Sequence, residues 1–406
     1  MISSAALHLL QLYSHCSPLL PNLVSLNWDS DDIYFPFVSP FISPFLTSIV
    51  IDVPRGGSPT LPPILTTLST LSHDIREIQI ERLYHDPSTE EASSQLLMQC
   101  NPYRLRKYNV DSPISASALR HAIQLPSLEE FWLVVGSFQL PDPLPIVVFP
   151  NLRLLDVEYN GDPTWLKLLP AIENPVLTSI FVECSGSDVP QFMEKFQLTT
   201  TGCGMHERLQ EFRVRSQEEF KITPQIIACT FSFRNLTCLK VLSDCSTVCQ
   251  TLDLTDSDVD LLTKAMPRLE SLAIGEEPCG VPSGITFRSL YTISRRCTRL
   301  TTLQIHFNPT LFVTKVETDS ESGDVALGVP DLRLKAASSD LCSVTAINVG
   351  NIPLPPQSNT SYIMALGLLG VFPCLEKLEY DDGDWEDVDD LIGVCRRMGR
   401  FAFGKA

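Results

Sequence analysis

The residues of this chain that could do chemistry do not form a familiar catalytic motif. The last eight residues, 399–406, read GRFAFGKA and nearly match the phosphate-binding loop GxxxxGK[ST], but Ala406 replaces the hydroxyl residue that binds magnesium. There is no GxGxxG and no GxSxG sequence. The seven histidines are scattered, and no two have the spacing of metal ligands on one helix. We therefore predict a non-catalytic protein without a cofactor, with a hydrolase whose site is assembled in space as a remote alternative.

The cysteines give no metal motif either. There are thirteen, an odd number, and no CxxC pair occurs among them. The closest two, Cys245 and Cys249, are four residues apart and have no histidine nearby. We predict reduced thiols buried in the core and no metal site.

The charge balance limits the partners. There are 48 Asp and Glu against 30 Lys and Arg, a net charge of −18, which repels phosphate backbones and argues against nucleic acid. The N-terminus has no basic residue before its apolar stretch, so we expect no signal peptide. The longest apolar run, residues 363–375, contains Pro373 and is too short to span a bilayer. We expect a monomer in the cytoplasm or nucleus.

One phrase recurs along the whole chain: Leu-x-x-φ-x-φ, where φ is apolar, often after a proline or cysteine turn. Residues 150–157, PNLRLLDV, are one example. We count thirteen copies with a mean period of about 29 residues and spacings from 23 to 44. The copies begin at Leu23, Leu46, Ile75, Leu105, Leu128, Leu152, Leu177, Leu209, Leu236, Leu269, Leu300, Val344 and Leu375.

The phrase predicts a stack of strand and helix units. Alternation in φ-x-φ indicates a short strand with one buried face. The segments between copies have helical spacing and start signals, for example Thr286 before a helix that ends near Arg295 and Arg296, and Ser88 as an N-cap. Stacked units bury one continuous core, so we predict an α/β solenoid shaped as a horseshoe, with parallel strands on the concave face and helices on the convex face.

Three segments follow from this pattern. Residues 1–19 are predicted to be an N-terminal capping helix. Residues 20–380 are predicted to form the solenoid, with a flexible acidic insertion at about 315–340. Residues 381–406 are predicted to be an acidic loop and a C-terminal capping helix.

The phrase resembles the leucine-rich repeat, L-x-x-L-x-L. The longer units, 255–272 and 293–303, resemble the cysteine-containing repeats of F-box/leucine-rich-repeat proteins, and the irregular, proline-rich spacing is most similar to the large fungal group of F-box-type proteins. The resemblance implies a concave face that holds a protein target for ubiquitin transfer by a cullin-type ligase. Because the first repeat starts at Leu20, we expect no F-box and no docking on the cullin adaptor. A ligase-independent interaction scaffold is the alternative.

The register of the phrase predicts which residues face the concave side. The predicted middle row is Asn27, Val50, Gln79, Asn109, Trp132, Asp156, Phe181, Arg213, Lys240, Ala273, Gln304, Asn348 and Glu379. Within and beside it we predict a partner-binding patch of Trp132, Leu154, Asp156 and Phe181, with Arg213 and Arg215 at its rim. The alternative is that Trp132 belongs to the core, because residues 131–135 are all apolar.

The acids are also patterned, since many follow a strand directly. The densest set lies in residues 381–390, and we predict an acidic rim there that attracts a basic partner. The alternative is that these acids serve solubility and the N-terminus of the last helix. The predicted rim is Asp381, Asp382, Asp384, Glu386 and Asp387.

Overall fold

The structure is a computed structural model of the 406-residue chain. It describes residues 18–29, 34–54, 58–71, 73–81, 87–135, 149–159, 161, 163–172, 176–243, 252–275, 283–309, 343–350, 352, 354, 360–380 and 385–403. The predicted N-terminal helix and the predicted insertion at 315–340 lie outside these residues. The described chain forms two compact units, Met1–Glu183 and Cys184–Ala406, which are treated separately below.

Thirteen strands are parallel and follow one another in chain order, with no exchange of neighbours. They are β1 (Ser25–Asp29), β2 (Ser48–Asp52), β3 (Glu77–Glu81), β4 (Lys107–Val110), β5 (Glu130–Val135), β6 (Leu154–Tyr159), β7 (Ser179–Cys184), β8 (Glu211–Ser216), β9 (Cys238–Ser243), β10 (Ser271–Ile274), β11 (Thr302–Ile305), β12 (Ala346–Gly350) and β13 (Lys377–Tyr380). Every strand begins two residues after the first apolar residue of a repeat copy. The predicted α/β leucine-rich-repeat solenoid is therefore confirmed in its strand number, direction and register.

The repeat leucines hold the turns that lead into the strands. Twelve of the thirteen first positions are at most 1% exposed, whereas Leu23, in the first copy, is only half-buried. The next backbone N–H crosses to the preceding repeat, as Arg153 N–H does to the carbonyl of Glu129 at 2.8 Å. A buried leucine and a cross-repeat hydrogen bond together fix where each strand starts.

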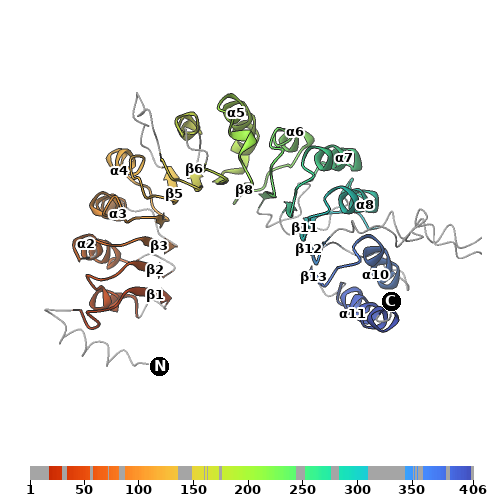
Figure 1. Cartoon of the computed structure of the whole chain (residues 1–406), viewed down its shortest axis with the longest axis horizontal. Helices are drawn as coiled ribbons and strands as arrows, with labels where there is room; N and C mark the ends of the chain where they lie inside the picture. Colours follow the sequence, from red (N-terminus) through yellow and green to blue (C-terminus); the bar gives the residue numbers. More distant parts are fainter. Residues whose placement is uncertain are drawn as a thin grey trace, which may run out of the picture. The chain divides into compact units, whose positions relative to one another are not determined.

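In the first unit, helices lie along one face of the strands (Figure 1). The helical elements are η1 (Phe35–Phe37), η2 (Ser39–Phe41), α2 (Leu61–Leu71), α3 (Pro87–Gln99), α4 (Ala116–Ala122) and η3 (Thr164–Ala171), where η denotes a 3₁₀ helix. Helix α2 buries Leu61, Ile64, Leu65 and Leu68, the spacing of a single helical face. Pro170 lies in the last turn of η3, where it cannot donate a backbone hydrogen bond.

In the second unit, the elements beside the strands are mostly α-helices (Figure 1). They are η4 (Gly186–Asp188), α5 (Val189–Gly202), η5 (Met205–Glu207), α6 (Pro224–Ala228), α7 (Asp256–Ala265), α8 (Phe287–Arg296), α10 (Thr360–Val371) and α11 (Glu386–Phe403). The predicted N-cap of α8 is confirmed: the Thr286 hydroxyl accepts from Arg288 N–H. Ser88 is not an N-cap, because α3 already begins at Pro87.

The core of each unit lies between the sheet and its helices. In the first unit, buried Tyr108 packs beside Phe131 and donates from its hydroxyl to the Ser93 carbonyl at 3.0 Å. In the second unit, Phe196 of α5 stacks on Phe212 of β8 with ring centroids 4.6 Å apart. These aromatic contacts tie a helix or its neighbouring turn to a strand, which keeps the strand face opposite the core in a fixed register.

Candidate functional site

The open face of the sheet, meaning the face opposite the buried core, carries the row of residues that the repeat pattern predicts. In the first unit, Asn27 pairs with Val50, Val50 with Gln79, Gln79 with Asn109, and Trp132 with Asp156. In the second unit the same holds from Arg213 through Lys240, Ala273, Gln304 and Asn348 to Glu379. The predicted register is confirmed for all of these pairs.

Trp132 lies on the open face. Its neighbours along β5, Phe131 and Leu133, are fully buried, whereas Trp132 is half-buried on the opposite side of the strand. The alternative placement in the core therefore does not hold, since strand alternation turns Phe131 and Leu133 inward and Trp132 to the opposite face. The Trp132 indole Nε1 is shielded from solvent, yet no described residue accepts a hydrogen bond from it.

The other predicted patch residues of the first unit lie on the next two strands. Leu154 and Asp156 are half-buried on β6, two residues apart and hence on one face, and Asp156 is the direct register partner of Trp132. Phe181 is half-buried on β7, which follows β6 in the sheet. One strand, β6, lies between those of Trp132 and Phe181, so their backbones are two strand spacings or about 9.6 Å apart, and Asp156 lies on that strand.

Four carboxylates, Asp111, Asp156, Glu158 and Glu183, lie between the middle of strands β4, β6 and β7 and the residue after each strand's carboxyl end; we call them the exit-edge carboxylates. Burial, together with the charges of Asp111, Glu183 and Asp156, raises the pKa of Glu158 from 4.5 to about 7. Glu158 and Glu183 are each the penultimate residue of their strand, β6 and β7, and Asp111, which the sequence analysis did not single out, directly follows β4. A cation placed among these groups would relieve their mutual repulsion.

The predicted arginines belong to the second unit. Arg213 on β8 is paired with Glu211, two residues earlier on the same face, at 3.2 Å, and its register partner is Lys240. Arg215 is exposed on the same strand. The structure thus places both arginines on the open face of their own unit.

The predicted acidic rim is described only in part. Asp381, Asp382 and Asp384 lie outside the described residues. Glu386 and Asp387 are exposed in the first turn of α11, where negative charge favours a helix N-terminus. Trp385, just before them, is fully buried and donates from its indole N–H to the Ile352 carbonyl at 2.6 Å, which anchors the start of this helix.

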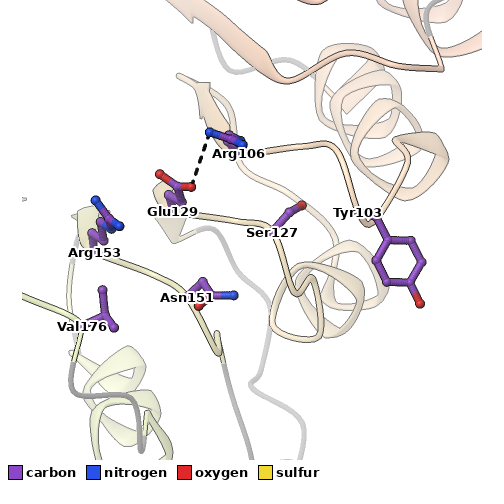
Figure 2. A pocket seen from close by; sticks show the side chains of 7 residues that line it. All are labelled: Tyr103, Arg106, Ser127, Glu129, Asn151, Arg153 and Val176. Atoms are coloured by element: carbon purple, nitrogen blue, oxygen red, sulfur yellow. Dashed lines mark ion pairs between the residues drawn. The ribbon is translucent and has the colours of Figure 1, made fainter.

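A groove of about 260 Å³ lies at the opposite edge of the first unit's sheet, where strands β4 to β7 begin (Figure 2). We call it the strand-entry groove. Sequence reasoning missed it. Its lining residues are Tyr103, Arg106, Ser127, Glu129, Asn151, Arg153 and Val176.

The described residues offer no metal centre. No group of three or more His, Cys, Asp or Glu side chains within the described ranges could hold an ion. The four described histidines, His73, His121, His206 and His306, belong to four different repeats. Burial lowers the pKa of His306 to about 4, so this side chain is neutral at pH 7. Among the helices of the described part of the chain, none is both long and apolar enough to cross a membrane.

Comparisons with known proteins add little beyond the topology. No protein-family model matches the chain. No curated protein matches it either. Among solved structures, the chain is similar to the crystal structure of the leucine-rich repeat-containing protein LegL7 from Legionella pneumophila, at 10% sequence identity and a TM-score of 0.37, over 87% of this chain and 98% of that one. The fold assignment rests on the chain's own strand order and repeat register.

Proposed function

We propose that this chain is a non-catalytic protein-recognition module whose target docks on the open face of the first unit, around Trp132 and Phe181. The observation that carries the proposal is the pair of half-buried aromatic side chains on β5 and β7 with Asp156 between their strands. Aromatic anchors surrounded by polar groups are the usual centre of a protein interface.

The exit-edge carboxylates indicate the chemistry of the target. Strand β6 carries Asp156 and Glu158, and strand β7 carries Glu183 beside Phe181 of the patch. The mutual repulsion of these carboxylates contributes to the raised pKa of Glu158. A lysine or arginine side chain of the target would pair with them and lower their repulsion. We therefore expect a basic segment in the target, next to an apolar group that contacts Trp132.

A more specific form of the proposal follows from the resemblance of the repeats to those of F-box/leucine-rich-repeat proteins. In this form, the chain acts as the substrate-receptor part of a ubiquitin ligase. The captured target would then be degraded. A ligase-independent scaffold would bind the same target without changing its turnover. Measuring the half-life of the target in cells with and without this chain separates the two: a longer half-life on deletion supports the receptor, and an unchanged half-life supports the scaffold.

The docking face is tested with matched variants. Crosslinked partners are captured with the wild type, with Trp132→Ala and with Phe45→Ala; Phe45 is an aromatic residue of the same unit, 60% exposed, that precedes β2. We expect Trp132→Ala to lose the partners that the wild type and Phe45→Ala retain. A charge reversal, Asp156→Arg, tests the same face without removing an aromatic side chain. Retention of all partners by both open-face variants would overturn the proposal.

A further inference from the structure

The basic residues of the first unit are concentrated at one edge of its sheet. Residues 1–183 contain nine Lys and Arg residues, and five of them lie within three residues before a strand or at its first position. These five are Arg76, Arg104, Arg106, Lys107 and Arg153. The exit-edge carboxylates lie at the opposite ends of the same strands. The same positions hold four acids, Asp74, Glu77, Glu129 and Glu130, so in a chain of net charge −18 this strand-entry edge has only a small positive balance, and Arg104 and Lys107 are already paired with Asp74 and Glu130.

Two of these arginines occupy equivalent positions in the strand-entry groove. Arg106 and Arg153 each stand one residue before a strand, β4 and β6 respectively, and Glu129 holds the same position before β5. Hydrogen bonds fix the row: Glu129 N–H donates to the Arg106 carbonyl at 2.7 Å, and Arg153 N–H to the Glu129 carbonyl at 2.8 Å. The backbones of the two arginines are therefore about 9.6 Å apart, the width of two strand spacings.

Neither guanidinium has a strong partner. The Arg106 Nη1 lies 3.9 Å from the Glu129 Oε1, and the Arg106 side chain is 60% exposed and the Glu129 side chain 35% (Figure 2). A well-formed arginine–carboxylate bond is about 2.7–2.9 Å long. Arg153 is exposed and makes no ion pair with any described residue. Both groups are therefore available for an anionic ligand.

The floor of the groove is held by hydrogen bonds to the backbone. The Ser127 hydroxyl donates to the Leu105 carbonyl at 2.6 Å, and the Asn151 amide donates to the Pro126 carbonyl. Val176 adds an apolar wall, and Tyr103, 79% exposed, stands at the rim. A floor fixed in advance loses little conformational entropy when a ligand binds.

We propose that the strand-entry groove binds two anionic groups, carboxylate or phosphate, that lie close together on an extended segment of a protein partner. One anion pairs with Arg106 and the other with Arg153, in the bidentate geometry that guanidinium offers. Glu129 stands between them and repels a single anion placed at the centre, so the groove selects two separated charges over one. This site is distinct from the open-face patch, and it stands whether or not that patch binds a target.

The test is fluorescence anisotropy with three labelled peptides that share one sequence. One carries two glutamates two residues apart, the second carries two phosphoserines there, and the third carries two glutamines. We expect the glutamate or phosphoserine peptide to bind, or both, and the glutamine peptide not to bind. Comparison of the two anionic peptides shows which chemistry is preferred. Binding should weaken when salt is raised from about 0.05 to 0.5 M.

Variants then locate the site. We expect Arg106→Gln and Arg153→Gln each to weaken binding about five- to tenfold, and Glu129→Gln to strengthen it. The matched control is Arg120→Gln, an exposed arginine of α4 outside the groove, which should change affinity less than about twofold. Trp132→Ala should leave peptide binding unchanged, which separates this site from the open-face patch.

Three outcomes would overturn the proposal. The first is equal binding of all three peptides. The second is an equal loss with Arg120→Gln and Arg153→Gln, which would mean diffuse attraction to the whole unit. The third is tighter binding of a duplex oligonucleotide than of either anionic peptide, with the same dependence on Arg106, which would assign the groove to nucleic acid.

Discussion

Replacing Glu158 by glutamine should stabilise the first unit in a way that depends on pH. The pKa of Glu158 is raised from 4.5 to about 7 by burial and by Asp111, Glu183 and Asp156. Between these two pH values the folded state holds a proton that the unfolded state has lost, so the free energy of unfolding falls as pH rises. Above about pH 7 the folded unit bears the full cost of an ionised, half-buried carboxylate. Glutamine never ionises and avoids this cost.

The magnitude follows from the width of that pH interval. At about 1.36 kcal/mol per pH unit, an interval of about 2.5 units corresponds to about 3.4 kcal/mol. Glu158 is only half-buried, and screening by solvent reduces this to about 1–2 kcal/mol. Glu158→Gln should therefore match the wild type near pH 4.5, gain stability over it as pH rises, and reach a constant difference above about pH 7.

The assay is urea unfolding of the wild type and Glu158→Gln at several pH values between 5 and 8, followed by tryptophan fluorescence. The control is Glu91→Gln, an exposed carboxylate of α3, whose effect should be small at every pH. The reasoning is refuted if the difference between Glu158→Gln and the wild type stays constant with pH, or if the variant is the less stable protein at pH 8.

Three further substitutions test how the repeats are held together, each by chemical denaturation. Leu152→Ala empties a fully buried repeat position and should cost about 2–5 kcal/mol. Gly284→Ala would place a Cβ 2.7 Å from a backbone carbonyl oxygen, so the chain must shift, and we expect a loss of about 1–3 kcal/mol. Asp256→Ala should cost about 1–3 kcal/mol, because the Asp256 carboxylate accepts from the Thr286 N–H at 2.8 Å and from the Thr286 hydroxyl at 2.7 Å, and so joins α7 to α8.

Matched control substitutions show whether the stability losses come from burial and close approach, and not from a general sensitivity of the fold to substitution. Leu198→Ala removes the same side chain at a position that is 69% exposed, and it should change stability by less than about 0.5 kcal/mol. Gly393→Ala, inside α11 with open space around the added Cβ, should be neutral or stabilising by up to about 1 kcal/mol. If Leu198→Ala costs as much as Leu152→Ala, or Gly393→Ala as much as Gly284→Ala, burial and close approach are not the causes.

The strands could be predicted from the sequence almost to the residue, because their determinants are local. Each strand starts two residues after the repeat leucine, since that leucine is buried and fixes the turn. The orientation of Trp132 cannot be predicted from its own strand, because residues 131–135 are uniformly apolar. It is predicted only when the strand is aligned with the neighbouring repeats on their leucines. Pairing with Asp156 decides its orientation.

The connecting segments were harder to predict. Their spacing is irregular, and several of them form short 3₁₀ helices, such as η1 and η3, where helical apolar spacing predicts an α-helix. Helix α3 starts at Pro87 rather than after Ser88 because proline is favoured in the first turn of an α-helix.

The strand-entry groove escaped the sequence because its charges are distributed one per repeat. Arg106, Glu129 and Arg153 are more than twenty residues apart, and no local window contains two of them. They become neighbours only when the repeats are aligned on their leucines and the next residue of each copy is read. The raised pKa of Glu158 has the same origin, since Asp111 and Glu183 come from other repeats.

The constant offset between repeat leucine and strand makes the open face a grid. Each column is one strand, and each row is one position of the repeat, so side chains that are neighbours across the open face are some 25 residues apart in the chain. Insertions of different length between copies, with spacings from 23 to 44 residues, leave the rows aligned. A substitution in one column therefore changes one point of this face and leaves the others in place, so the chemistry of the face can change one residue at a time.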